Sequence, residues 1–266
     1  MVLSLALGLV VGIIMGLTGA GGGILAVPLL VFGLQMSVAQ AGPIGLLAVG
    51  ISAGLGALIG LKKNLVRYRA ALLIAGTGIV LAPLGVWLAQ VLNTKILSVL
   101  FAAVLAWVAH KTFKQARAAQ NGAQQNRLAP PCLRDAEKGR FVWTSKCAQV
   151  LALSGAIAGF LSGLLGVGGG FVMVPALQRY TDLTTRSVVA TSLAVIALVS
   201  LAGVGTSIAA GQLDMAVALP FAAGGAVGMG VGTKLSSRLS QKNLKLSFAA
   251  ICAAVSVGMI VKSLGT

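Results

Sequence analysis

The sequence predicts an all-α polytopic membrane protein made of two inverted-topology repeats, each a glycine-broken helical hairpin plus three transmembrane helices. Three observations lead to this prediction. The composition is 58% hydrophobic and only 9% charged, far from that of a soluble globular domain. A glycine-rich motif that begins at Gly16 recurs at Gly163, an offset of 147 residues. Finally, equivalent loops of the two copies differ in charge.

The membrane spans are predicted from long runs that contain no Asp, Glu, Lys or Arg. Because a helical crossing needs about 20 apolar residues, most of these runs hold one crossing and the longest hold more. The charge-free runs cover residues 1–61, 70–94, 147–178, 187–213, 215–233 and 246–261. We expect three clear spans per half, at residues 39–60, 70–91 and 96–110 and then at 187–208, 215–234 and 246–262.

The duplication extends well beyond the glycines. Residues 16–30 read GLTGAGGGILAVPLL and residues 163–177 read GLLGVGGGFVMVPAL. At the same offset, Gly12 pairs with Gly159, Gly85 with Gly232 and Phe101 with Phe248. An ungapped register of this length indicates two copies of one structural unit. The expected domains are a first membrane repeat at 1–110, a basic linker at 111–146 and a second membrane repeat at 147–266.

Loop charges predict how each half is oriented. Residues 62–69 carry four basic side chains, whereas the equivalent residues 209–216 carry none and one acid, Asp214. Since basic loops face the cytoplasm, equivalent loops are expected on opposite sides of the membrane. Inversion needs an odd number of crossings per half, so the glycine element contributes either two short crossings or a re-entrant hairpin. Both options place the 111–146 linker in the cytoplasm and the two termini outside, in the periplasm of a bacterium.

The glycine motif predicts an anion site. Glycine clusters break helices, and a proline is tolerated in a first helical turn, so we expect half-helices to begin just after Gly23 and just after Gly170. Unpaired amides at such helix starts carry partial positive charge and bind anions. Close packing of small residues is the competing interpretation. The candidate substrate-binding residues are Gly19, Gly21, Gly22, Gly23, Gly166, Gly168, Gly169, Gly170, Thr191 and Ser192, with Pro28 and Pro175 as structural helix breaks.

The paired motif G-L-x-G-x-G-G-G-x-x-x-V-P, the chain length and the basic central loop resemble the TauE/SafE sulfite exporter family, also called the toluene sulfonate uptake permease group. The resemblance covers essentially the whole chain. It implies transport of small sulfur-containing anions, such as sulfite, thiosulfate, sulfoacetate and other organosulfonates, across the bacterial inner membrane. By the same resemblance, the ATSL sequence at 190–193 is similar to a family element, whereas the first half reads PIGL at 43–46.

The distribution of acids suggests a mechanism. Asp135, Glu137, Asp182 and Asp214 all fall in predicted loops, so no carboxylate is expected at membrane depth to bind a coupling cation. An inside-negative potential by itself favours the exit of an anion. We therefore expect an inner-membrane transporter, in the exporting direction, that works by alternating access. The alternatives are an anion channel and a non-transporting membrane assembly or partner subunit.

Other function classes are not expected. The net charge of +16 arises from basic residues in the gaps between apolar runs, which is typical of loops facing anionic lipid rather than nucleic acid. No motif of an enzyme, cofactor site or metal site is present, and a dinucleotide fingerprint would need glycine where Ile24 and Phe171 stand. The three cysteines lack metal-binding spacing, and their odd number argues against a disulfide framework. The oligomeric state stays open.

Overall fold

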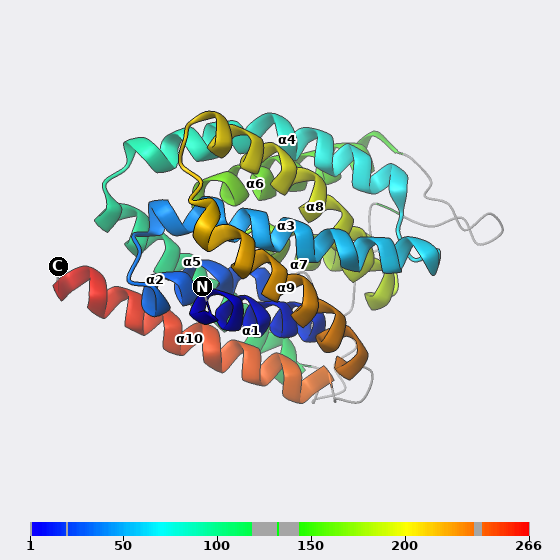
Figure 1. The fold of residues 1–266 in the computed structure, drawn as a ribbon. Coiled ribbons are helices and arrows are strands. Elements are labelled where there is room, and N and C mark those ends of the chain that lie inside the picture. The colour runs from blue at the N-terminus through cyan, green and yellow to red at the C-terminus, as the bar shows by residue number, and fades with distance from the viewer. Residues whose placement is uncertain (1, 20, 119–131, 133–143, 237–240, 266) are drawn as a thin grey trace.

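A computed structural model describes residues 2–19, 21–118, 132, 144–236 and 241–265, and these residues form a helical bundle (Figure 1). Its first half contains α1 (Val2–Thr18), the short 3-10 helix η1 (Gly22–Leu25), α2 (Ala26–Gly33), α3 (Val38–Lys62), α4 (Tyr68–Val91) and α5 (Thr94–Ala118). Its second half contains α6 (Ser145–Leu165), α7 (Gly170–Tyr180), α8 (Thr185–Ala209), α9 (Met215–Ser236) and α10 (Gln241–Gly265).

The predicted polytopic all-α class is confirmed. Within the described residues, seven helices are long and apolar enough to cross a membrane: α3, α4, α5, α6, α8, α9 and α10. Six of them coincide with the predicted spans to within a few residues, apart from the ends of α5 and α10. The outer surface is apolar as well, since Leu72, Leu201 and Val261 are each more than 60% exposed. Such a surface is unfavourable in water and suits contact with lipid.

Helices of one half pack against helices of the other half, in equivalent pairs. Helix α1 packs along α9, and its equivalent α6 packs along α4; α3 lies against α8, and α5 lies against α10. The closest approaches are made by glycines: Gly12 stands against Gly225, and the equivalent pair Gly159 and Gly78 makes the same contact. A β-carbon on Gly12 or Gly159 would collide with the facing backbone, and one on Gly225 or Gly78 would press against the side chain of Ser52 or Val199, so packing of small residues explains this part of the glycine content.

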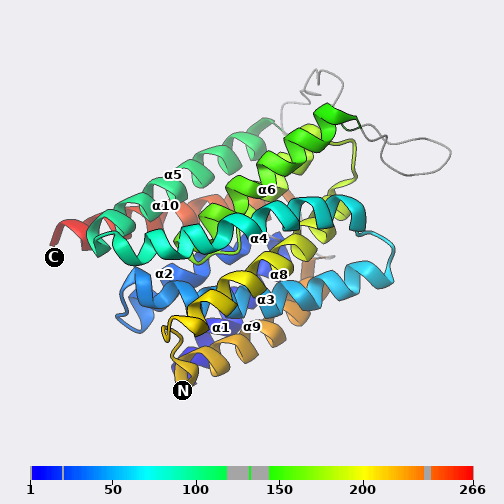
Figure 2. The ribbon, with the colours of Figure 1, turned by 90° about the horizontal axis from the view of Figure 1, so that it is seen from above.

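Equivalent helices also run in opposite directions (Figures 1 and 2). Helix α3 starts at the end of the bundle where both chain termini lie, whereas α8 starts at the other end, close to where α5 ends and α6 begins. We call these the terminal end and the linker end. The chain therefore returns to the terminal end after α10, so both termini lie at this end of the bundle, with the linker end opposite them.

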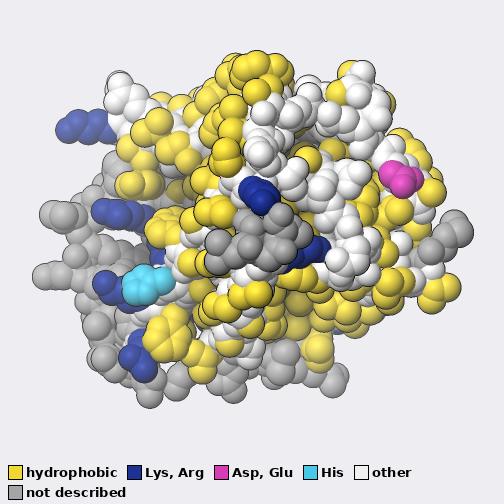
Figure 3. Space-filling view, turned by 90° about the vertical axis from the view of Figure 1, so that its left-hand side faces the viewer, with side chains coloured by type: hydrophobic (Ala, Val, Ile, Leu, Met, Phe, Trp, Pro, Cys, Tyr) yellow, Lys and Arg dark blue, Asp and Glu magenta, His cyan; other side chains and the backbone are white. Residues whose placement is uncertain are grey.

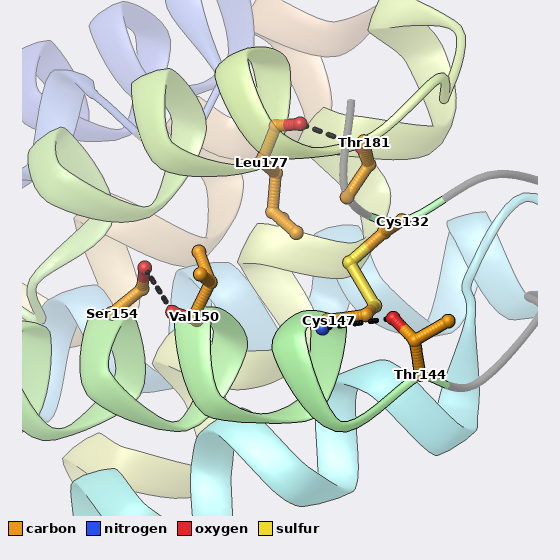
Figure 4. Close-up of a disulfide and its surroundings, with 7 residues drawn as sticks. All are labelled: Cys132, Thr144, Cys147, Val150, Ser154, Leu177 and Thr181. Atoms are coloured by element: carbon orange, nitrogen blue, oxygen red, sulfur yellow. Dashed lines mark hydrogen bonds between the residues drawn. A yellow bond between two sulfur atoms is a disulfide. The ribbon is translucent and has the colours of Figure 1, made fainter. Parts of the chain in front are cut away.

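The linker differs from its prediction in two respects. Helix α5 continues to Ala118, through the first residues of the predicted 111–146 linker, while residues 119–131 and 133–143 lie outside the described residues. Cys132 forms a disulfide with Cys147 at the start of α6 (Figure 4), with a Cα–Cα distance of 5.0 Å. The argument against disulfides from the odd cysteine count is therefore wrong. Folding leaves Cys252 buried and free, and it brings the other two cysteines together beside the end of α7.

Candidate substrate site

The two glycine motifs each turn the chain at the end of a long helix. We call Gly19 with residues 21–23 the first glycine segment, and residues 166–170 the second glycine segment. Gly19 (φ +77°) and Gly166 (φ +71°) adopt the left-handed conformation that favours glycine. Their amides donate to the carbonyl oxygens of Met15 and Ser162, at 2.7 and 2.9 Å, and so end α1 and α6.

The copies diverge after this first turn. Gly168 and Gly169 are both left-handed, and α7 begins directly at Gly170. In the first half, Gly21 is right-handed and precedes η1, and α2 begins only at Ala26. The two segments are therefore equivalent in sequence and different in conformation.

The two prolines also stand at different places. Pro28 is the third residue of α2 and lies in its first turn, as predicted. Pro175 is the sixth residue of α7, inside the helix, so the first-turn prediction is wrong for this copy. The helix starts earlier because Gly169 in the left-handed conformation caps it, and Val172 and Met173 both donate to the Gly169 carbonyl, at 3.1 and 3.2 Å. The backbone amides of Gly170 and Phe171 come before these first helical hydrogen bonds, so they have no acceptor within α7.

The two glycine segments meet inside the bundle. A β-carbon built on Gly23 would lie 3.3 Å from the carbonyl oxygen of Val167 and 3.1 Å from the side chain of Val49 on α3. The same Val49 side chain would lie 2.8 Å from a β-carbon on Gly168. Each segment also rests on the third helix of the opposite half, Gly166 against Gly42 and Gly19 against Val189. All the predicted site glycines are buried except Gly21, which is half-buried.

The two predicted hydroxyl residues have different surroundings. The Thr191 hydroxyl oxygen accepts a hydrogen bond from the backbone amide of Arg67 at 3.1 Å, which ties α8 to the start of α4. The neighbouring Ser187 hydroxyl donates to the Leu65 carbonyl at 2.9 Å and strengthens the same contact. Ser192 is fully buried, and its hydroxyl has no hydrogen-bond partner.

Two further buried hydroxyls were missed from the sequence. Ser162 on α6 and Ser200 on α8 are each 1% exposed, and neither hydroxyl has a partner. Ser200 lies beside the second glycine segment, because its hydroxyl oxygen would be 3.4 Å from a β-carbon on Gly168. Sequence alone gives little signal here, since a serine in an apolar helix usually bonds to its own preceding turn.

A cavity of about 110 Å³ opens at the linker end and extends to the first glycine segment. Thr18 and Gly21 lie on its wall, and α7 contributes Phe171 and Pro175. Two lysines, Lys111 of α5 and Lys245 of α10, also line it. The Lys111 ammonium group lies 4.6 Å from the centre of the Trp107 ring. This cavity can attract an anion and lead it towards the glycines.

A second cavity, of about 420 Å³, opens at the terminal end and is lined by equivalent positions. At the offset of 147 residues, Thr112, Gln115, Gln178, Thr185 and Lys245 of the first cavity correspond to Met259, Lys262, Val31, Val38 and Ser98 of the second. Its lining includes none of the described glycine-segment residues.

Lys262 bridges α10 and α2 at this terminal end. Its ammonium group donates to the Val31 carbonyl at 3.0 Å and to the side-chain oxygen of Gln35 at 3.1 Å. It also lies 5.7 Å from the centre of the Phe32 ring. Viewed from this end, hydrophobic side chains cover much of the described surface, with Lys and Arg side chains scattered among them (Figure 3).

Comparisons with known proteins agree with this architecture. The sequence model of the family "Sulfite exporter TauE/SafE" matches residues 4–259. A "Probable membrane transporter protein" of Xylella fastidiosa (strain 9a5c) is 29% identical over 99% of this chain and 96% of its own length. The "Probable membrane transporter protein YunE" of Bacillus subtilis is 27% identical, with 91% of each chain covered. No solved structure matches the chain significantly. The chain therefore belongs to the TauE/SafE sulfite exporter family of multi-pass membrane transporters.

Proposed function

We propose that the protein exports small sulfur-containing anions, such as sulfite, thiosulfate or organosulfonates, across the bacterial inner membrane by alternating access of two inverted halves. The observation that carries this proposal is the pair of equivalent cavities at opposite ends of the bundle. Of these two cavities, the linker-end one extends to a glycine segment, whereas the terminal-end one, where Lys262 bridges α10 and α2, does not. If the two ends of the bundle exchanged these arrangements, the site would open to one side of the membrane at a time.

The exporting direction follows from charge. Asp182 and Asp214, the two carboxylates among the described residues, are both exposed at helix ends. Neither is placed to bind a coupling cation at membrane depth. The membrane potential favours the exit of an anion by roughly 2.3 kcal/mol per charge per 100 mV, so export needs no such ion.

The orientation rests on the basic residues, which gather at the linker end. The described ones at helix ends there are Lys62, Lys63, Arg67, Arg69, Lys111, Lys114, Arg117, Lys146, Arg179, Arg186, Lys234 and Lys245, against Lys95 and Lys262 at the terminal end. This asymmetry supports a cytoplasmic linker end. The Cys132–Cys147 disulfide favours the opposite orientation, because stable disulfides are rare in the cytosol. With the linker inside, we expect this pair to be reduced in growing cells.

The test uses purified full-length protein in liposomes under an imposed potential. Fluxes of sulfite, thiosulfate and sulfoacetate are measured against concentration, with empty liposomes as the control for passive leakage. Saturable flux of at least one anion is expected. Flux that rises without saturation would identify an anion channel. Protein-free levels of flux for every anion would leave a non-transporting membrane subunit and refute the proposal.

A further inference from the structure

Three buried serines of the second half have hydroxyls without any hydrogen-bond partner: Ser162, Ser192 and Ser200. They are 1%, 0% and 1% exposed. Other serines in the same helices satisfy themselves locally: the Ser154 hydroxyl donates to the Val150 carbonyl at 2.7 Å, and the Ser207 hydroxyl donates to the Gly203 carbonyl at 2.8 Å. An unsatisfied buried hydroxyl destabilises a fold, so three of them in one half call for an explanation.

Their positions relate them to the second glycine segment. The Ser200 hydroxyl points to the space beside Gly168. Ile196, one turn earlier on α8, borders the same space, and Ser192 lies one further turn back on that stripe. Ser162 precedes Gly166 by one helical turn, and its carbonyl accepts from the Gly166 amide. Just beyond stands the N-terminus of the eleven-residue helix α7, a second source of donors for an anion.

We propose that Ser162, Ser192 and Ser200, with the N-terminus of α7, form the inner part of the substrate site and select a singly charged oxyanion. This inference rests on the transport function proposed above and specifies its substrate class. The site is one-sided, because the equivalent first-half positions are Met15, Gly45 and Ala53, which carry no hydroxyl. The space beside Gly168 is closed in the present arrangement, so an anion reaches the serines when the halves move.

The selection by charge follows from the kind of donor that the proposed site contains. Arg67 at the start of α4 also has a buried Nε without a partner, but its side chain is only half-buried and is not one of these donors. Among the described residues, every buried polar side chain is a serine or a threonine. Hydroxyl and amide donors can stabilise one negative charge but supply no full positive charge. Because the energy of desolvation scales with the square of the charge, a dianion loses about four times as much as a monoanion on entering such a site. Lys111 and Lys245 line the outer cavity and would attract anions of either charge.

The experiment compares anions of different charge in proteoliposomes of the full-length protein. Methanesulfonate stays a monoanion at every pH used, whereas sulfate and thiosulfate are dianions. We expect kcat/KM for methanesulfonate to exceed that for either dianion by at least roughly tenfold. Flux of sulfite at fixed total concentration should fall as rising pH converts hydrogen sulfite to its dianion, while methanesulfonate flux stays constant. Equal kcat/KM values for monoanion and dianions would overturn the proposed charge selection.

Serine variants test the residues themselves. Ser162→Ala, Ser192→Ala and Ser200→Ala should each raise KM for methanesulfonate roughly tenfold, the usual effect of losing one hydrogen bond to a charged ligand. Ser207→Ala is the matched control, because Ser207 is equally buried on α8 and bonds within its own helix. Unchanged KM in all three variants would refute the serine site while wild-type flux still supports transport. Wild-type protein without flux of any anion would instead refute the proposed function.

Discussion

Replacing Ser200 by alanine should stabilise the resting protein while it weakens transport. The Ser200 hydroxyl is buried and unpartnered, and such a group costs about 1–3 kcal/mol of folding free energy. Ser200→Ala removes this penalty without breaking a bond. It leaves a void of roughly 12 Å³, which at about 24 cal/mol per Å³ costs about 0.3 kcal/mol. The net gain is about 0.7–2.7 kcal/mol, or a rise in melting temperature of roughly 1–11 °C for a chain of this size.

The control variant has the opposite sign. Ser207→Ala deletes a hydrogen bond from the Ser207 hydroxyl to the Gly203 carbonyl, so its melting temperature should stay equal or fall by an amount equivalent to about 0.5–1.5 kcal/mol. Thermal unfolding of both variants is followed in detergent by tryptophan fluorescence, without substrate. If Ser200→Ala lowers the melting temperature as much as Ser207→Ala does, the Ser200 hydroxyl has a partner in the native protein and the reasoning fails.

Adding substrate should stabilise Ser200→Ala less than it stabilises the wild type. Methanesulfonate at 100 times the wild-type Kd stabilises the wild type by about 2.7 kcal/mol. A variant with tenfold weaker binding gains only about 1.4 kcal/mol at the same concentration. The ligand-induced shift in melting temperature should therefore be about half as large in Ser200→Ala. Equal shifts in both proteins would mean that Ser200 does not contact the anion.

Three further predictions concern the glycine turn, the terminal-end contact and the disulfide. Gly166→Ala should prevent recovery of folded protein, because the left-handed backbone alone adds about 1–3 kcal/mol of strain and the new β-carbon meets Gly42. Gly76→Ala is the control, because a β-carbon there has open space around it. Its yield of folded protein in size-exclusion chromatography should equal that of the wild type. Lys262→Gln should shift the equilibrium between the two arrangements about tenfold towards the one that is open at the terminal end. A cysteine placed at Ser98, in the terminal-end cavity, should then react faster with maleimide, and one placed at Thr112, in the linker-end cavity, should react more slowly. Unaltered rates at both positions would argue against Lys262 as the closing contact. Reduction of the Cys132–Cys147 disulfide should lower the free energy of unfolding by about 3 kcal/mol, the expected effect of opening a loop of 15 residues. A Cys132→Ser variant is the control. If its melting temperature equals that of the reduced wild type, the free thiols have no separate effect on stability.

The spans could be predicted because the membrane constrains the sequence directly. A helix in lipid must be apolar along about 20 residues, so the predicted spans match α3, α4, α8 and α9 to within two residues at each end. The glycine hairpins could be predicted as well, since three successive glycines in an apolar run disfavour a continuous helix. The start of α7 at Gly170 agrees with that reasoning, while the position of Pro175 inside the helix depends on the left-handed cap at Gly169.

The substrate site was only partly predictable. The glycines were identified from their repetition, but Ser162 and Ser200 were not, because nothing in the sequence tells whether a serine hydroxyl bonds its own helix or is left unpaired. Thr191 illustrates the same limit, since its bond to the Arg67 amide joins residues more than 120 positions apart. The Cys132–Cys147 pair was missed because a count of cysteines carries no information about which of them lie close together.

The sequence by itself determined that this chain crosses a membrane, that it is built from two copies of one unit, and where each copy breaks. These features depend on composition, periodicity and local backbone preference, which act over a few turns of helix. The tertiary structure decided at which end of the bundle a cavity reaches a glycine segment, which buried hydroxyls remain unpaired, and which cysteines bond. Those outcomes arise where helices of the two halves pack against each other, and such contacts join residues that lie far apart along the chain.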